Sequence, residues 1–262
     1  MIKISIVLFV IYLLAILILF LMQEKITFQN TVLPTNHQFS FKQKFEEVNI
    51  TTTDNNVLNA LHFKVENPKG VLLYFHGNKG SLDRWGTIAS YFTKFNYNVF
   101  VVDYRSYGKS TGDFDEVLMY GDAQLCYDYL KKRYAEDKIT IYGRSLGCTF
   151  AIRTASQNNP KQLILEAPFY NLSDAAKYHY PYVPYGLLLK YKFNSNKYIK
   201  KVICKTTIFH GTEDEVIPIK SGKKLANSAI KENTTFITIK GGTHHNLFDY
   251  ENYQKTITEL LK

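Results

Sequence analysis

The sequence is poor in the residues that would define a disulfide-bonded, collagen-like or disordered protein. Among 262 residues there are only 3 Cys, 7 Pro and 14 Gly. The cysteines are odd in number and irregularly spaced, at Cys126, Cys148 and Cys204, so they predict buried thiols rather than disulfides or a metal site. With 45% apolar and 21% charged residues, the composition is that of a folded globular protein.

Runs of basic residues interleaved with aromatic residues are also missing. The net charge is +9, from 32 Lys and Arg against 23 Asp and Glu, which raises the question of an anionic partner. The lysines, however, are spread as single residues and pairs such as Lys131-Lys132 and Lys200-Lys201. A groove that binds nucleic acid needs a concentrated basic patch, so we expect no nucleic-acid partner.

One long hydrophobic run is present, and it covers residues 4–22 with only Ser5 and Tyr12 as polar interruptions. As a helix, these residues would extend about 28 Å, which is enough to cross a bilayer. A cleavable signal peptide has a shorter apolar core and a cleavage site of small residues, which the segment after Phe20 lacks. The run therefore favours an uncleaved single-pass membrane anchor over a removed signal peptide.

The charges on the two sides of this run, Lys3 and Lys25, are nearly balanced. We interpret them as placing the N-terminus in the cytoplasm and the rest of the chain on the non-cytoplasmic side. The expected organisation is a transmembrane anchor over residues 1–24, a polar stalk or packing arm over 25–44, and one folded domain over 45–262.

Beyond residue 44, strand-like and helix-like segments alternate along the chain. Two adjoining strands followed by this alternation predict an α/β fold, with a mostly parallel sheet, helices on both faces and an antiparallel N-terminal edge. The segments that predict strands are 45–52, 57–65, 71–75, 99–103, 139–142, 163–166, 207–209 and 236–239, and those with helical periodicity are 82–95, 117–134, 146–156, 219–230 and 250–261.

The motif Gly-x-Ser-x-Gly spans Gly143, Ser145 and Gly147, between a predicted strand and a predicted helix. With 12 serines and 14 glycines in the chain, chance would produce about 0.03 such motifs, so the match is specific. A nucleophile elbow needs this pattern because its strained turn closes only when the flanking positions lack bulk. The alternative is a glycine-rich connection in which Ser145 only caps the following helix.

A serine hydroxyl needs a base to take its proton and an acid to orient that base. Asp214 follows the next-to-last predicted strand, and His244 follows the last one. Because the carboxyl ends of parallel strands share one edge of a sheet, both are expected near Ser145. Along the chain the three candidates therefore come in the order Ser145, Asp214, His244.

Other residues are open as alternatives for these roles. Glu213, Glu215 and Glu166 are weaker candidates for the acid, and His245 competes with its neighbour for the base. A metal site is the competing interpretation, and its candidate ligands are His76, His210, His244, His245 and Asp103. These residues show neither helical i, i+4 spacing nor Cys/His pairs, so no metal is expected.

Attack by Ser145 on a carbonyl would place negative charge on its oxygen, which must be met by fixed donors. The backbone N–H of Leu146, directly after the serine, is one expected donor. The loop that begins at His76 supplies the second, most plausibly the backbone N–H of Asn78.

Five further segments carry a family resemblance: 74–80 (YFHGNKG), 103–110 (DYRSYGKS), 166–169 (EAPF), 210–218 (HGTEDEVIP) and 242–244 (GTH). Together with the apolar run and the Gly-x-Ser-x-Gly motif, they resemble α/β-hydrolases of the membrane-anchored ABHD (α/β-hydrolase domain) type. The resemblance covers nearly the whole chain. It implies Ser145 as nucleophile, Asp214 as acid, His244 as base and oxyanion donors at Asn78 and Leu146, with no cofactor.

A cap is expected over about residues 170–205, which are rich in tyrosine. These aromatic side chains either form an apolar acyl-binding wall near the membrane surface or only pack the cap onto the core.

The resemblance implies a membrane-anchored serine hydrolase that cleaves carboxylic esters or thioesters through an acyl-enzyme, with 45–262 as its catalytic domain. The expected substrate is a small-molecule or lipid-like acyl ester. Two alternatives are a serine peptidase of the same fold, since the same three residues cut amides, and a non-catalytic binding protein that retains the fold.

Overall fold

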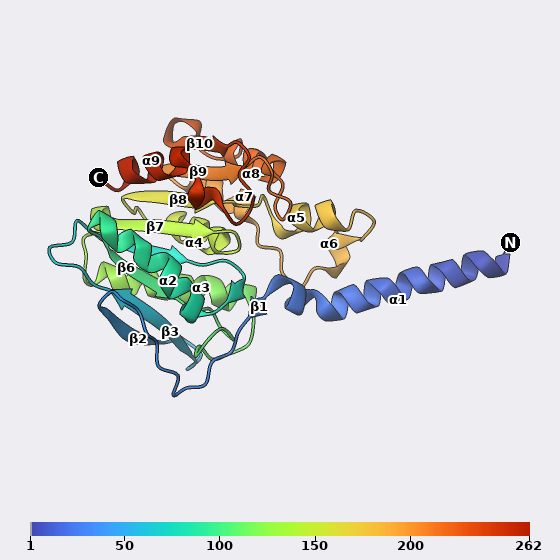
Figure 1. The fold of residues 1–262 in the computed structure, drawn as a ribbon. Coiled ribbons are helices and arrows are strands. Elements are labelled where there is room, and N and C mark those ends of the chain that lie inside the picture. The colour runs from blue at the N-terminus through green and yellow to red at the C-terminus, as the bar shows by residue number, and fades with distance from the viewer. Residues whose placement is uncertain (1) are drawn as a thin grey trace.

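A mixed sheet of eight strands forms the centre of the chain in the computed structural model, which describes residues 2–262 (Figure 1). The strand order is β10-β9-β8-β7-β4-β6-β3-β2. Neighbours from β10 to β6 pair in parallel, whereas β3 pairs antiparallel with β6 and with β2. The strands are β2 (Phe45–Thr51), β3 (Val57–Phe63), β4 (Val71–Phe75), β6 (Asn98–Val102), β7 (Ile139–Arg144), β8 (Gln162–Glu166), β9 (Lys205–Gly211) and β10 (Thr234–Ile239).

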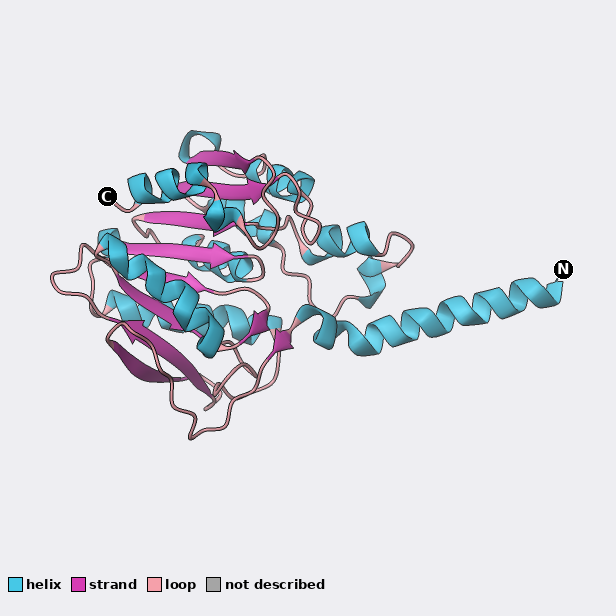
Figure 2. Cartoon of the chain, in the orientation of Figure 1, coloured by secondary structure: helices cyan, strands magenta, loops and turns pink. Residues whose placement is uncertain are grey.

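Helices cover both faces of this sheet (Figure 2). On one face, α2 and α9 bury Trp85 and Tyr253 against the sheet. On the other, α3, α4 and α8 bury Tyr127, Phe150 and Leu225. The structure therefore confirms the expected α/β fold with its antiparallel N-terminal edge. The helices are α2 (Leu82–Ser90), α3 (Glu116–Lys131), α4 (Gly147–Ala155), α5 (Leu172–His179), α6 (Tyr185–Leu188), α7 (Ser195–Tyr198), α8 (Ile219–Ala226) and α9 (Glu251–Leu260).

Several helices are shorter than their apolar periodicity predicts. The segment predicted as one helix over 82–95 is α-helical only to Ser90, and it continues as a 3-10 helix over Tyr91–Phe95. Asn96 then ends it in a left-handed conformation with φ of 63°. The helix predicted to reach residue 230 ends at Ala226 and is followed by tight turns. Tight turns after a helix prolong its pattern of buried side chains, so periodicity alone overestimates its length.

The first helix, α1 (Ile2–Thr27), projects away from the body of the protein (Figure 1). Within its segment Lys3–Thr27, a window of 18 residues has a mean hydropathy of 3.3 and is not buried. In the part of the chain that the structure describes, it is the one helix long and apolar enough to cross a membrane, and it is a candidate single-pass anchor. The helix continues three residues beyond the expected boundary at residue 24.

After α1 the chain runs along the body of the protein. Phe28 is buried and stacks on Phe114 with 4.1 Å between ring centroids. The short strand β1 (Gln29–Asn30) pairs in parallel with β5 (Lys79–Gly80). Further on, the ring of Phe41 lies so close to Gly86 that a Cβ there would be 2.4 Å from it. This segment packs through long-range contacts, which a local periodicity does not reveal.

A buried ion-pair network ties the edge of the sheet to α3. Arg105 is 1% exposed and donates to both carboxylate oxygens of Asp122, at 2.5 and 2.9 Å. It also donates to both oxygens of Asp54, at 2.7 and 2.8 Å. Both carboxylates accept bidentate hydrogen bonds, an arrangement that the planar guanidinium favours.

Replacing Arg105 with Met should lower the free energy of unfolding by about 3–5 kcal/mol, because the variant leaves the buried Asp122 carboxylate without its counter-charge. The measurement is urea unfolding in detergent micelles, followed by fluorescence of Trp85, which is the single tryptophan. Lys64→Ala is the control, since its pair with Glu46 is partly exposed to solvent and 3.5 Å long. Equal losses for the two variants would contradict the prediction.

Candidate active site

Ser145 lies on a sharp turn between β7 and α4. Its φ is +51°, in the left-handed region that costs a non-glycine residue about 1–3 kcal/mol. A Cβ at Gly143 would lie 2.7 Å from the Cα of Cys148, and one at Gly147 would lie 2.0 Å from the carbonyl oxygen of Phe75. Both glycines are therefore required for steric reasons, as expected for a turn that closes against β4.

The structure brings Ser145, His244 and Asp214 together at one edge of the sheet. The Nε2 atom of His244 lies 2.9 Å from Oγ of Ser145, and its Nδ1 atom lies 2.8 Å from Oδ2 of Asp214. All three residues are buried and 9% exposed or less. Asp214 follows β9 and His244 follows β10, so loops at the carboxyl ends of parallel strands position both side chains.

Several donors surround the carboxylate of Asp214. Its Oδ1 accepts from the backbone N–H groups of Val216 and Ile217, at 3.0 and 2.7 Å. Burial alone would raise the pKa of Asp214, but hydrogen bonds from His210 and His244, the charge of His244 and the N–H of Ile217 outweigh it and hold this pKa well below its usual range. The carboxylate is therefore ionised at neutral pH.

His210, considered from the sequence only as a candidate metal ligand, supports this carboxylate. Its Nε2 atom lies 2.8 Å from the carbonyl oxygen of Ile217 and 3.4 Å from Oδ2 of Asp214. On the other side of the ring, a Cβ at Gly222 would lie 2.3 Å from Nδ1, so α8 packs directly on the imidazole. The position of this histidine, near the end of a buried strand and directly before a glycine, is the signal in the sequence.

The alternatives for the acid and the base lie elsewhere. Glu166 pairs with Arg144, with Oε1 and Nε 3.1 Å apart, and both side chains are largely buried. Arg144 in turn donates to the carbonyl oxygens of His244 and His245, at 3.4 Å each. His245 is exposed, and its ring is perpendicular to that of His244. Glu166 and Arg144 thus hold the loop that carries His244, a link the sequence analysis missed.

The loop after β4 lies beside Ser145, since a Cβ at Gly77 would be 3.7 Å from the serine Cβ. The backbone N–H groups of Asn78 and Leu146 donate to no protein acceptor within residues 2–262. Other atoms of Asn78 do form hydrogen bonds. Its side-chain amide donates to the carbonyl oxygen of Thr27 at 3.1 Å, and its own carbonyl oxygen accepts from the hydroxyl of Tyr107 at 2.7 Å.

The buried carboxylate of Asp103 orders this loop. Its Oδ1 lies 3.1 Å from Nε2 of His76, and its Oδ2 accepts from the N–H of Leu82 at 3.0 Å. The hydroxyl of Tyr104 donates to the carbonyl oxygen of His76 at 2.7 Å. A Cβ at Gly108 would lie 1.9 Å from Asp103, so only glycine fits there. The candidate donors for an oxyanion are therefore fixed in place before any ligand binds.

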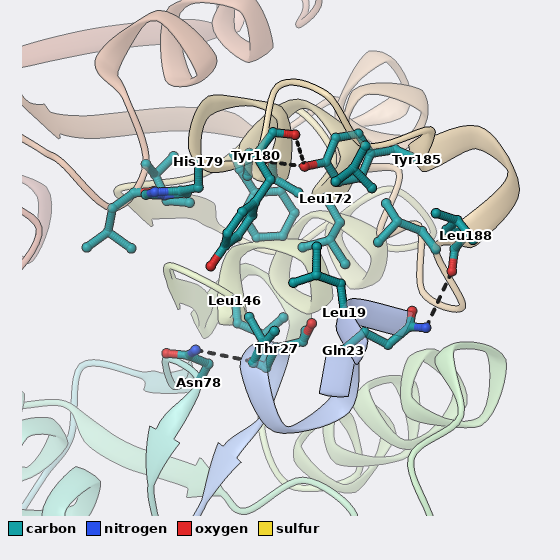
Figure 3. Close-up of a pocket in the computed structure, with 18 of the residues that line it drawn as sticks. Leu19, Gln23, Thr27, Asn78, Leu146, Leu172, His179, Tyr180, Tyr185 and Leu188 are labelled. Carbon is teal, nitrogen blue, oxygen red and sulfur yellow. Dashed lines mark hydrogen bonds between the residues drawn. The ribbon is translucent and has the colours of Figure 1, made fainter. Parts of the chain in front are cut away.

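A cavity of about 350 Å³ opens next to Ser145 (Figure 3). Its walls come from α1, from the loop that carries Asn78, from the cap and from the loop after β9. Most of the lining side chains are apolar, which suits an acyl chain rather than a polar ligand. Among the described residues, no group of three or more His, Cys, Asp or Glu side chains is arranged to hold a metal ion.

The sheet order, with a serine on the turn after β7, is typical of hydrolases of the α/β type. Residues 66–195 match the family model described as "Serine aminopeptidase, S33". Uncharacterized protein R595 of Acanthamoeba polyphaga mimivirus is 32% identical over 238 residues, which cover 81% of this chain and 79% of that protein. The chain belongs to the α/β-hydrolase family, as the resemblance inferred from its sequence implies.

Two further relatives are similar over different lengths. Lysophosphatidylserine lipase ABHD12 of Gallus gallus is 31% identical over 183 residues, which cover 61% of this chain and 47% of that protein. The chain thus spans about half the length of this relative. Protein bem46 of Schizosaccharomyces pombe is 29% identical over 235 residues, which cover 84% of this chain and 78% of that protein.

Solved structures confirm the fold. The esterase Pf2001 of Pyrococcus furiosus has a TM-score of 0.71 at 20% identity, covering 88% of this chain and 98% of its own. Est1E of Butyrivibrio proteoclasticus, solved with ferulic acid bound, has a TM-score of 0.63 at 20% identity, covering 81% of this chain and 95% of its own.

The charge of Asp214 predicts how an Asp214→Asn variant responds to pH. Because the folded-state pKa is depressed, the carboxylate stabilises the fold above its unfolded pKa of about 3.9, and this stabilisation is lost as the pH falls through the folded-state pKa. At pH 7 the variant should be less stable by about 1.5–3 kcal/mol, since hydrogen bonds to a charged group are lost. This difference should narrow on acidification below about pH 4.

The measurement is the unfolding midpoint of both proteins in detergent micelles between pH 3 and pH 7. Asp113→Asn, at an exposed position, is the matched control and should show no such narrowing. A difference between wild type and Asp214→Asn that stays constant across this range would contradict the assignment.

Proposed function

We propose that the chain is a membrane-anchored serine hydrolase that cleaves carboxylic esters or thioesters of lipid-like acyl groups through an acyl-enzyme. The observation that carries this proposal is the continuous hydrogen-bonded series from Asp214 through His244 to Ser145, next to an apolar cavity. In this proposal residues 1–24 form the anchor, 25–44 the packing arm and 45–262 the catalytic domain, with its cap at about 170–205. The catalytic domain is placed on the non-cytoplasmic side.

In the first step, Oγ of Ser145 attacks the acyl carbon while Nε2 of His244 takes its proton. The distance of 2.9 Å between these atoms allows direct transfer. The other ring nitrogen, Nδ1, keeps its proton and donates a hydrogen bond to Asp214, so the carboxylate stabilises the imidazolium that forms. The N–H groups of Asn78 and Leu146 meet the negative charge on the acyl oxygen.

In the second step, the tetrahedral adduct collapses and the bond to the leaving oxygen or sulfur breaks. The imidazolium of His244 gives its proton to this leaving group, which departs as an alcohol or thiol. A water molecule then acts as the nucleophile in the same two steps. His244 takes a proton from the water, the hydroxide attacks the acyl carbon, and Ser145 leaves with the proton that the imidazolium returns. The products are a carboxylic acid and the alcohol or thiol.

Two observations favour acyl esters over peptides as substrates. The cavity next to Ser145 has mostly apolar walls, and part of these walls comes from the candidate membrane anchor. Among the relatives, ABHD12 is named a lysophosphatidylserine lipase. The description of the matching family as a serine aminopeptidase keeps amide hydrolysis as the second candidate, since the same three residues can cut an amide.

A Ser145→Ala variant should lose labelling by a fluorophosphonate, because the phosphorus can bond only to an activated serine oxygen. Its hydrolysis of p-nitrophenyl butyrate should fall at least about 10⁴-fold. Both are measured with the full-length protein in detergent micelles. Ser40→Ala, at an exposed position on the arm, is the matched control and should behave as wild type. Labelling that persists in Ser145→Ala would reject the role of this serine.

Matched substrates distinguish the two candidate activities. An acyl thioester and p-nitrophenyl ester of the same fatty acid should both be hydrolysed at least about 100-fold faster than an aminoacyl p-nitroanilide, because the apolar pocket binds the acyl chain. The opposite order of kcat/KM would favour the aminopeptidase.

A further inference from the structure

The anchor helix contributes directly to the cavity that contains Ser145. Leu19, Gln23, Ile26 and Thr27 stand at positions i, i+4, i+7 and i+8, so they lie on one face of α1, and all four line the cavity. Figure 3 shows Leu19 pointing toward Leu172 of the cap and Gln23 bonded to Leu188, while Thr27 lies beside Asn78. The same helix therefore serves as a candidate membrane span and as a wall of the candidate active site.

Hydrogen bonds fix the cap to this helix. The side-chain amide oxygen of Gln23 accepts from the N–H of Lys190 at 2.7 Å, and its nitrogen donates to the carbonyl oxygen of Leu188 at 3.4 Å. At the next residue of each segment, the hydroxyl of Tyr191 donates to Glu24 at 2.6 Å. These contacts join segments that are about 165 residues apart, so the gap between α1 and the cap has a defined geometry.

The tip of the cap reaches the middle of the hydrophobic span. The hydroxyl of Tyr12 donates to the carbonyl oxygen of Tyr182 at 2.9 Å. Tyr12 lies ten residues before Met22, which corresponds to about 15 Å along a helix, or half of a hydrocarbon core about 30 Å thick. If α1 spans a bilayer, the cap tip lies within it.

The composition of the cap tip fits that position. Residues 178–189 contain no Asp, Glu, Lys or Arg, and they expose three tyrosines, of which Tyr182 is 85% exposed. Irregular backbone is tolerated in lipid only where its polar groups are paired. Here the hydroxyl of Tyr185 donates to the carbonyl oxygens of Ala176 and Tyr180, and Tyr12 pairs with Tyr182.

We infer that the cap tip inserts into the bilayer and that the substrate is a membrane-resident ester with a single acyl chain, which enters the cavity between α1 and the cap. This inference rests on the proposed function and adds the route and the substrate class. The volume of about 350 Å³ is at the low end for ligand pockets, which suits one chain rather than two. The acyl chain would pass from lipid to pocket without crossing water, since Leu19 and Phe20 line the cavity from a helix most of whose other side chains are exposed.

The first test uses full-length protein in phosphatidylcholine vesicles, with p-nitrophenyl palmitate in the bilayer and p-nitrophenyl acetate in the water. Leu19→Trp narrows the entrance and should lower kcat/KM for the palmitate at least about tenfold, and that for the acetate less than about twofold. Leu21→Trp is the matched control on the same helix, because Leu21 is 71% exposed, and it should change neither value. The route would be overturned if Leu19→Trp lowered kcat/KM equally for both esters. It would also be overturned if Leu19→Trp and Leu21→Trp lowered kcat/KM for the palmitate equally.

The second test needs no turnover. A fluorophore on Tyr182→Cys should be quenched by nitroxide groups midway along lipid acyl chains, whereas one on Lys132→Cys, at an exposed site on the body, should not. The three native cysteines are buried and therefore resist labelling. Absence of quenching at Tyr182→Cys would overturn the insertion of the cap. If wild-type protein hydrolysed neither ester while quenching occurred, the proposed function would fail and the insertion would stand.

Discussion

The left-handed turn at Ser145 is the constraint on which the rest of the structure depends. Its N–H donates to the carbonyl oxygen of Glu166 at 2.8 Å, so β8 holds the turn from one side. On the other side, Gly147 packs against the carbonyl oxygen of Phe75 at the end of β4. The strain of this conformation persists because two neighbouring strands and the start of α4 leave the backbone no alternative. The turn thus lifts the hydroxyl to the sheet edge where His244 and Asp214 lie.

A second constraint comes from the anchor helix, which is part of the cavity as well as a candidate membrane span. Gln23 and Tyr12 bind the cap through its backbone carbonyl and N–H groups, and Thr27 binds Asn78 at the loop beside Ser145. The position of the helix in a membrane is therefore coupled to the geometry of the candidate oxyanion donors. This coupling is consistent with the proposal that lipid-like esters reach the cavity between the helix and the cap.

The sequence predicts the sheet and its helices well because the strands are short apolar runs separated by turn residues. It also predicts that Ser145, Asp214 and His244 meet at one edge, since parallel strands carry their following loops to the same side. Their catalytic roles stay predictions. The pairing of Arg144 with Glu166 is not predictable in this way, because it depends on the register of β7 and β8 rather than on any local pattern.

The role of α1 in the cavity is likewise invisible in the sequence. A helix that faces lipid on one side and an apolar pocket on the other has apolar side chains on both faces. The periodicity of its hydrophobic residues therefore does not distinguish the two faces. The contact depends on single polar residues, Tyr12 and Gln23, which in the sequence only interrupt or end the run. The segment over 28–44 is similar, since its strand pairing and ring contacts join it to distant residues.

The central claim is that Ser145 becomes acylated during hydrolysis. It is tested most directly by mixing the full-length protein with a long-chain acyl thioester, quenching with acid within the first turnover and analysing the peptides by mass spectrometry. The account predicts that the mass of the acyl group appears on the peptide that contains Ser145, before free fatty acid is released at its steady rate. Release of free fatty acid at its steady rate from the start, with the acyl group on another residue or on none, would contradict it.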